Sequence, residues 1–395
     1  MPEAIAAWAR QLKEPGPHSL ALLFALDSLT RAALVTVIPL ELYRVLGSVR
    51  DLSILYAVTG WGGILGSLLI PTLIRRFAAR KIYLGAAIML TMVPVLMALS
   101  TLPSMGAAVL FRACAGICLL NTLNLFITNY IPKQQLTRTE PLRYFYAAGA
   151  WSAGPIIGGT LLDFYGPFAA YGVAFALGLI FIAYFLSVGF NYDPQNLPGR
   201  LPSGNPLRYI RRFFQQKRLV LAWFLNMGYE FWWIALFFYG PVYIRERGGS
   251  DAEAAMLTSA VTFLLFLTLA AGWLGRRIGL RRFFVFWFLF GGIVTLAAGF
   301  VPGPYWVVGI LLFIGGFMGI ATDAAGWILF LRAVRARERP EMTLVFTLYR
   351  DVALLSSTIF FSILLSFAPT GSVFVTVGIA LLVCAWVARS IPRGM

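Results

Sequence analysis

Charged residues are scarce in this sequence. Asp, Glu, Lys and Arg account for 12% of the 395 residues, and hydrophobic residues account for 59%. A soluble globular chain carries about 25% charged residues, so this chain has about half the charge that a water-facing surface needs. The composition excludes a soluble enzyme, a disordered chain and a small disulfide scaffold, and it indicates a polytopic membrane protein.

Histidine, cysteine and nucleotide-binding motifs are also rare or absent. His18 is the one histidine, which excludes histidine-ligated metals, serine–histidine hydrolysis and most histidine proton relays. Cys114, Cys118 and Cys384 lie in apolar segments, where buried thiols are expected. No Walker-type Gly-Lys-Ser/Thr motif occurs, so the sequence predicts no nucleotide hydrolysis. We therefore expect neither a cofactor nor a bound metal.

Long apolar segments are what the sequence has in place of charge. A helix crosses the hydrocarbon core of a membrane in about 20 apolar residues. Segments of this kind lie at 19–43, 52–74, 82–101, 106–130, 143–162, 167–189, 220–244, 254–274, 282–301, 305–330, 345–368 and 372–389. They lack the alternation of β-barrel strands, and the first is too long for a cleaved signal peptide. The sequence predicts an all-α membrane protein with twelve transmembrane helices.

The basic residues predict the orientation of these spans. With both termini in the cytoplasm, 25 of the 32 Lys and Arg residues fall on cytoplasmic segments and three inside spans. The remaining four, Arg44, Arg50, Arg245 and Arg247, fall on the opposite side. This asymmetry follows the positive-inside rule, and it explains the formal net charge of +16 without a nucleic-acid partner. We expect an integral protein of a bacterial inner membrane with both termini cytoplasmic.

The two halves of the chain resemble each other. Basic positions in 73–82 recur in 274–283 at an offset of 201 residues, and the first and seventh spans start at the same offset. Two six-span halves in parallel repeat are typical of many secondary transporters. The alternative is that short basic loops recur at cytoplasmic positions without a repeat. We expect an N-terminal segment 1–18, a six-helix bundle 19–189, a linker 190–219, a second six-helix bundle 220–389 and a tail 390–395.

Three motifs make the whole chain resemble the major facilitator superfamily. The loop 66–81 is similar to the family's loop motif A, with Arg75 at the usual acidic position. Arg112, followed four residues later by glycine, looks like motif B, and 154–159 (Gly-Pro-Ile-Ile-Gly-Gly) looks like motif C, which is common in exporters. The resemblance implies two six-helix halves related by a pseudo-two-fold axis, which transport by alternating access.

The motif positions are candidates for conformational and gating roles. The repeat copy of the loop motif also lacks the acid and has Arg276 in its place. Small residues in the motif C likeness also serve plain helix packing. The candidates are Gly66, Arg75, Arg76, Arg80, Gly154, Pro155, Gly158, Gly159, Arg276 and Arg277.

Charges inside the spans are the strongest functional signal, because each costs at least ~2.5–3.5 kcal/mol in the membrane. They are Asp27, Arg31, Arg112, Glu230, Asp323, Arg350 and Asp351. The resemblance implies that the first, fourth, seventh and tenth spans line a central cavity, and these four spans hold five of the seven charges.

Glu230, Asp27 and Asp323 are the candidate proton-coupling residues. Glu230 comes first, because its neighbours on the seventh span include no cation, whereas Asp27 has Arg31 one turn away. A cation from another span, such as Arg112 or Arg31, can approach Glu230. The alternatives are a Glu230 hydrogen-bonded permanently to another helix, an Asp27–Arg31 pair that only neutralises itself, and a gating or interhelical role for Asp323.

Candidate substrate contacts are the remaining charges, two aromatic residues of the seventh span that share a face, and amides of the fourth span. They are Arg31, Arg112, Asn121, Asn124, Tyr229, Trp233, Arg350 and Asp351. Interhelical hydrogen bonding is the alternative for the amides, and a lipid-interface or interhelical role is the alternative for Arg350 and Asp351.

The sequence predicts a secondary active transporter of a small organic solute that is anionic or zwitterionic and partly apolar. We expect coupling to protons, export or antiport, and a monomer in the lipid bilayer. Import of a metabolite or siderophore-like solute is the alternative within the same class. A membrane enzyme is disfavoured because the predicted outer loops are too short for catalytic loops. A receptor or scaffold on the same fold would leave the seven buried charges without a reason.

Overall fold

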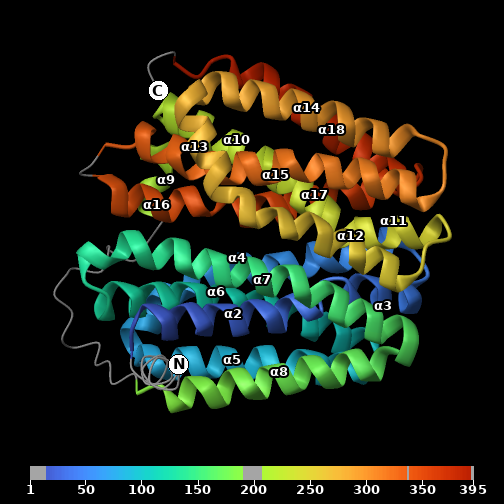
Figure 1. Ribbon diagram of the computed structural model, residues 1–395, viewed down its shortest axis with the longest axis horizontal. Helices are drawn as coiled ribbons and strands as arrows, with labels where there is room; N and C mark the ends of the chain where they lie inside the picture. Colours follow the sequence, from blue (N-terminus) through green and yellow to red (C-terminus); the bar gives the residue numbers. More distant parts are fainter. Residues whose placement is uncertain (1–14, 190–206, 336–337, 393–395) are drawn as a thin grey trace, which may run out of the picture. The chain divides into compact units, whose positions relative to one another are not determined.

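The computed structural model describes residues 15–189, 207–335 and 338–392, and every regular element within them is helical (Figure 1). Nine of these helices are long and apolar enough to cross a membrane, and a tenth span results if the bent pair 251–278 counts as one. Most of the predicted N-terminal segment 1–18 and linker 190–219, and part of the tail 390–395, lie outside the described residues.

Helices occupy all six predicted spans of the first half. The first span is broken into two helices, and the others are single helices. The elements are α2 (Pro17–Ala33), α3 (Val37–Leu46), α4 (Val49–Arg76), α5 (Ala79–Ala98), α6 (Leu102–Tyr130), α7 (Lys133–Tyr165) and α8 (Pro167–Ser187).

The predicted spans of the second half are helical as well, with more interruptions. A short helix, α9 (Leu207–Phe214), precedes them. The elements that follow are α10 (Lys217–Ile234), η2 (Ala235–Tyr239), α11 (Gly240–Glu246), α12 (Asp251–Phe263), η3 (Leu264–Leu267), α13 (Thr268–Ile278), α14 (Leu280–Phe300), α15 (Tyr305–Ala333), α16 (Arg339–Thr347), α17 (Tyr349–Leu364) and α18 (Gly371–Ala388).

Residue contacts divide the chain into two compact units. Unit 1 comprises Met1–Ile38 and Leu65–Arg200, and unit 2 comprises Pro39–Ile64 and Leu201–Met395. The second unit therefore includes most of α3 and the first part of α4, which belong to the predicted first bundle. The bounds of the two predicted bundles stay a prediction.

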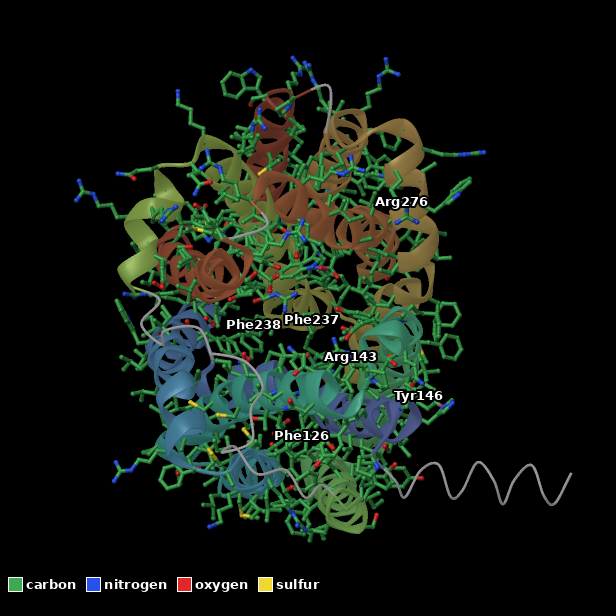
Figure 2. All side chains as sticks on the ribbon, turned by 90° about the vertical axis from the view of Figure 1, so that its left-hand side faces the viewer. Phe126, Arg143, Tyr146, Phe237, Phe238 and Arg276 are labelled. Atoms are coloured by element: carbon green, nitrogen blue, oxygen red, sulfur yellow. The ribbon has the colours of Figure 1, made fainter. Side chains whose placement is uncertain are left out.

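An aromatic cluster fills part of the core of unit 1. Tyr83 of α5 lies with its ring centroid 5.5 Å from that of Phe126 on α6, and 5.8 and 4.6 Å from those of Phe181 and Phe185 on α8. Figure 2 labels Phe126 within this cluster. Burying aromatic rings in tilted and edge-on contacts removes a large apolar area from solvent, and it holds α5, α6 and α8 together.

Two glycines of α7 allow its backbone to touch the end of α2. A Cβ on Gly158 would lie 1.8 Å from the carbonyl oxygen of Ala33, and one on Gly154 would lie 2.4 Å from the Cβ of Ala32. Neither position has room for a side chain. The contact coincides with the end of α2 at Ala33, so the glycine–proline segment packs against the break in the first span.

The second unit contains a π-helical segment, η2, directly after α10. Its wider turn presents Phe237, Phe238 and Tyr239 in succession, and Figure 2 labels the first two. Pro241 follows at the start of α11. Single π-helical turns inside helices often occur at functional sites, and this one lies five residues after Glu230.

Candidate functional site

A charged cluster in unit 2 brings together four of the predicted site residues. The Nε atom of Arg350 on α17 lies 3.8 Å from a carboxylate oxygen of Glu230 on α10. Electrostatic interactions also link Glu230 to Asp323 on α15 and to Asp351 on α17. Glu230 therefore lies beside one guanidinium and interacts with two further carboxylates.

Two tyrosines connect this cluster by hydrogen bonds. The hydroxyl of Tyr229 donates to Asp323 Oδ1 at 3.0 Å and lies 2.6 Å from the hydroxyl of Tyr349. The Tyr349 hydroxyl in turn accepts from Arg350 Nε at 3.1 Å. A continuous chain of hydrogen bonds thus runs from the guanidinium to Asp323.

The cluster has a buried part and an exposed part. Tyr229 and Tyr349 are buried, at 2% and 5% exposure, whereas the side chains of Glu230 and Arg350 are 20% and 53% exposed. Trp233, one turn after Tyr229, is nearly buried and stacks on Phe237 with ring centroids 5.2 Å apart. The exposed groups can meet a solute, and the buried tyrosines connect them to Asp323.

Sequence reasoning missed Tyr349, and it named Arg112 and Arg31 as cations that can approach Glu230. Within unit 2 the cation beside Glu230 is Arg350, which sequence reasoning listed only as a substrate contact. Both arginines on the other spans are engaged within unit 1. The sequence shows that Tyr349 is an aromatic residue next to Arg350 in a predicted span. It does not show which helix Tyr349 and Arg350 face.

Unit 1 holds a second, smaller charged group. Arg31 donates to both carboxylate oxygens of Asp27, from Nε at 2.9 Å and from Nη2 at 2.6 Å. Asp27 is buried and the Arg31 side chain is 20% exposed, with its guanidinium carbon 6.0 Å from the ring centroid of Trp151. These contacts support the neutralising pair that the spacing allows.

Arg112 and Gly116, the motif B likeness, both contact Arg31. Arg112 Nη2 donates to the backbone carbonyl of Arg31 at 2.9 Å. Carbonyl groups in the last turn of a helix lack intrahelical partners, so this bond satisfies one of them near the end of α2. A Cβ on Gly116 would lie 3.5 Å from the Arg31 guanidinium. The motif therefore supports the break in the first span.

Arg143 of α7, labelled in Figure 2, is a buried guanidinium at the start of the predicted span 143–162. It donates from Nη1 to the Asn124 side chain at 2.8 Å, and its Nη2 lies 2.9 Å from Glu140. The ring centroid of Phe24 is 4.9 Å from its guanidinium carbon. Asn124 is thus engaged with α7, whereas the Asn121 side chain donates to the carbonyl of Ile117 in its own helix.

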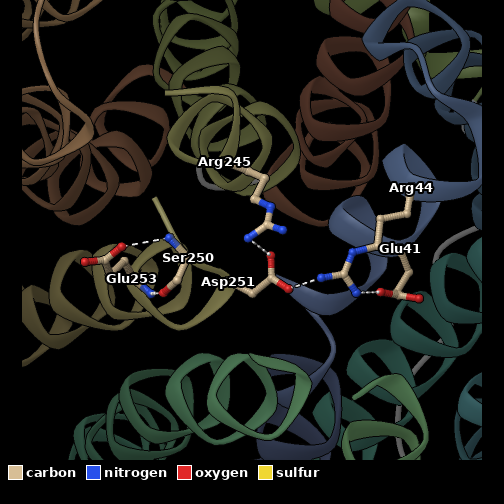
Figure 3. A network of polar contacts seen from close by, with 6 residues as sticks. All are labelled: Glu41, Arg44, Arg245, Ser250, Asp251 and Glu253. Atoms are coloured by element: carbon tan, nitrogen blue, oxygen red, sulfur yellow. Dashed lines mark hydrogen bonds and ion pairs between the residues drawn. The ribbon is translucent and has the colours of Figure 1, made fainter. Parts of the chain in front are cut away.

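An ion-pair network in unit 2 joins α3, α11 and α12 (Figure 3). Arg44 pairs with both Glu41 and Asp251, and Arg245 lies 3.7 Å from Asp251. Asp251 is buried at the start of α12, where Ser250 and Glu253 form a capping box. The positive end of a helix favours a carboxylate in its first turn. Arg44 and Arg245, two of the four arginines predicted on the outer side, therefore take part in this network.

The first part of α4 packs on η2 next to this network. The hydroxyls of Ser53 and Tyr239 lie 2.9 Å apart, and the rings of Tyr56 and Phe238 stack with centroids 4.0 Å apart. Ser53 and Tyr56 are three residues apart and share one face of α4. We call these two contacts and the ion-pair network the α3–α4 latch.

The loop-motif positions form fewer contacts. The Arg75 side chain lies outside the described residues, Arg76 lies over the adjacent Phe77, and Arg277 lies over Trp273 with its guanidinium carbon 4.5 Å from the ring centroid. Within the part of the chain that the structure describes, no ion pair engages Arg76, Arg80, Arg276 or Arg277. Gly66 approaches Cys114, and Pro155 and Gly159 are buried in α7.

No group of three or more His, Cys, Asp or Glu side chains suited to a metal ion occurs among residues 15–189, 207–335 and 338–392. The clusters described above are built from carboxylates, guanidiniums and phenols, which bind and move protons and organic ions.

The fold and its buried charges define an integral membrane protein of paired helical units. Residues 20–358 match the Major Facilitator Superfamily, and the chain belongs to that family. No curated protein matches the sequence. The predicted family and the predicted all-helical membrane fold are both confirmed.

Several solved transporter structures have the same fold. The nucleoside transporter NupG aligns with a TM-score of 0.75 at 14% identity, over 95% of this chain and 98% of that one. A POT family transporter in complex with 5-aminolevulinic acid gives 0.76 at 13% identity, over 94% and 95%. A D-xylose-proton symporter gives 0.74 at 15% identity, over 95% and 98%.

The protein is therefore a secondary transporter of the major facilitator type and not an enzyme. It binds a small-molecule substrate within a membrane.

Proposed function

We propose that the chain couples the transport of a small organic solute, anionic or zwitterionic and partly apolar, to the movement of protons. The observation that carries this proposal is the cluster in which Arg350 lies beside Glu230, while Asp323 and Asp351 interact with Glu230. With all three acids ionised, the cluster has more negative than positive charge. Binding a proton or an amine relieves that imbalance, so the two can compete or alternate at one place.

The contacts support different roles for the predicted residues. Glu230 and Arg350 are the exposed members of the cluster and are proposed to meet the solute and the proton. Trp233 supplies an apolar wall beside them. Asp27 is buried and accepts two hydrogen bonds from Arg31, which supports a structural role for Asp27. The partly exposed Arg31 is the proposed anion contact of unit 1.

The direction and setting of transport are proposed from the sequence. The glycine–proline segment that resembles motif C favours export or antiport. Its glycines also explain the close packing of α7 on α2, so the direction rests on the motif alone. The excess of basic residues on one side supports a bacterial inner membrane with both termini cytoplasmic. We propose a monomer as the working unit.

Flux through proteoliposomes under an imposed pH gradient tests this function. The first probes are 5-aminolevulinic acid, a nucleoside and D-xylose, because solved relatives of the same fold carry these names. We expect accumulation of the zwitterionic probe or of related amino and carboxylic acids, and no accumulation of the neutral sugar.

Liposomes containing the Asp51→Asn variant are the matched control, because Asp51 is exposed and lies outside every cluster described above. Accumulation of probes regardless of charge would contradict the proposed solute class. Binding without flux, for every solute in a broader thermal-shift screen, would favour a receptor or scaffold instead.

A further inference from the structure

The hydrogen-bond chain in unit 2 has a direction that the chemistry of its ends determines. A guanidinium can only donate, so the Tyr349 oxygen accepts from Arg350. An ionised carboxylate can only accept, so Tyr229 donates to Asp323. Each phenol has one proton. Tyr349 must therefore donate its proton to Tyr229, across the 2.6 Å that separates the two oxygens.

Protonation of Asp323 allows the hydrogen bond between Tyr349 and Tyr229 to reverse its direction. A protonated carboxyl can donate, and when it donates to Tyr229 the Tyr229 proton turns toward Tyr349. The Tyr349 oxygen then accepts from both Arg350 and Tyr229, and its own proton must point out of the chain to another acceptor. Glu230 is the carboxylate that already shares Arg350 with Tyr349.

We propose that Tyr229 and Tyr349 form a reversible hydrogen-bond switch that transmits the protonation state of Asp323 to the Arg350–Glu230 pair. The two tyrosines are positioning residues, since they change which partners Arg350 and Glu230 have. The use of this switch in coupling rests on the proposed function, but the switch itself does not.

The surroundings leave few other groups to produce the same effect. The charged and titratable groups that interact with the two tyrosines are Glu230 on α10, Asp323 on α15 and Arg350 on α17. Asp351 interacts with Glu230 from α17. Helices α12, α13 and α14 also pack on α15, but no hydrogen bond or ion pair joins them to Asp323 within the described ranges.

Burial supports a switch over a solvated set of groups. Tyr229 and Tyr349 are almost fully buried, so water cannot freely replace the bond between their hydroxyls. Hydrogen bonds in a low-dielectric interior polarise one another. A change in protonation at Asp323 therefore alters the hydrogen bonding of Arg350 at the other end of the chain.

The test uses the full chain in lipid nanodiscs and measures its thermal unfolding midpoint across the pH range in which it stays folded. We expect a pH-dependent step that Asp323→Asn removes, because linkage makes stability depend on each group whose proton affinity changes on folding. Tyr349→Phe should move that step by roughly one pH unit or abolish it, although the Tyr349 hydroxyl does not contact Asp323.

A merely structural tyrosine predicts a different result. Tyr239→Phe is the matched control, since it removes a buried hydroxyl that bonds Ser53 in the same unit. It should lower the unfolding midpoint about equally at every pH and leave the step in place. If Tyr349→Phe fails to fold, Arg350→Lys provides the comparison, because it keeps the charge but loses the Nε–H donor to Tyr349.

The proposal is overturned if the pH-dependent step is unchanged in the tyrosine and arginine variants that fold. It is also overturned if the wild-type profile has no step that Asp323→Asn removes. A step that moves as expected, in a protein that shows no proton-driven flux of any solute, would leave the switch standing and contradict the proposed function.

Discussion

Arg44 and Asp251 form an ion pair that joins the end of α3 to the first turn of α12. The carboxylate is 1% exposed, whereas the arginine is 39% exposed. Both are predicted to lie on the outer side of the membrane. The pair ties Pro39–Ile64, a segment of the predicted first bundle, to helices of the second half within unit 2. We expect the α3–α4 latch to hold α3 and the first part of α4 against α11 and α12.

Removing Arg44 should loosen this latch. Arg44→Gln removes one of the two arginines that pair with buried Asp251, and we expect a loss of about 1–3 kcal/mol in unfolding free energy. In a variant without native cysteines, a Ser53→Cys thiol should react faster with a membrane-impermeant reagent when Arg44 is also replaced. Arg50→Gln is the control, since Arg50 is an exposed arginine nearby. Equal labelling of the Arg44 and Arg50 variants would show that the Arg44 ion pair does not hold the latch together.

The Asp27–Arg31 pair should behave as a structural unit. Asp27→Asn or Arg31→Gln leaves one partner uncompensated in a low-dielectric site, which costs roughly 3–5 kcal/mol when a buried pair is broken. We expect each single variant to lower the unfolding midpoint and the double variant to recover part of it. Unchanged stability in all three variants, together with lost transport, would show that the pair serves the solute instead.

Gly158 should not tolerate a methyl group. The added Cβ would overlap the Ala33 carbonyl, so Gly158→Ala is expected to cost about 3 kcal/mol or more. Gly149→Ala is the matched control in the same helix, because nothing lies within 4 Å of its Cβ position. In an open helical position this change should be neutral or stabilising by up to about 1 kcal/mol. Similar unfolding midpoints for both variants would contradict the close packing of α7 on α2.

The attachment of α9 should weaken in acid. Glu338, between α15 and α16, accepts hydrogen bonds from Gln216 and Arg212. The Gln216 bond, with a smaller effect of Arg212, lowers the pKa of the Glu338 carboxyl. This stabilisation is present above the usual range of glutamate and is lost as the pH falls through the lowered pKa.

Trp223 reports on that attachment, because its ring contacts Phe214 of α9 with centroids 5.6 Å apart. The fluorescence difference between the wild type and its Trp223→Phe variant should change on acidification. Glu338→Gln should remove that pH dependence, whereas Glu140→Gln should keep it. A pH response that persists in Glu338→Gln would rule out this carboxyl as its source.

The fold was predictable because membrane spans are encoded by their length and apolar composition. Interruptions were predictable only in part: Pro39 and Pro241 lack the N–H that would bond the carbonyl four residues earlier, which lies in the break after Ala33 and in the π-helix Ala235–Tyr239. The break depends on Gly158 and Arg112, which come from other helices. Such tertiary contacts leave no periodic signal in the local sequence.

The candidate site was predictable only as a set of unusual residues. A charge in a span is visible in the sequence, but its partner is not. Glu230 and Arg350 are 120 residues apart, and helix periodicity does not say which faces of two spans meet. The partners of Arg143 were not predictable either, because the apolar pattern begins at that residue, whereas α7 begins ten residues earlier.

Uphill transport by Glu230→Gln tests whether Glu230 couples transport to protons. This variant mimics the protonated side chain, so it should fold, bind and exchange a transported solute. In proteoliposomes with an imposed pH gradient, the wild type should accumulate the solute above equilibrium, and Glu230→Gln should equilibrate it without accumulation. If Glu230→Gln accumulates the solute to the wild-type level, Glu230 does not couple transport to protons and the account is contradicted.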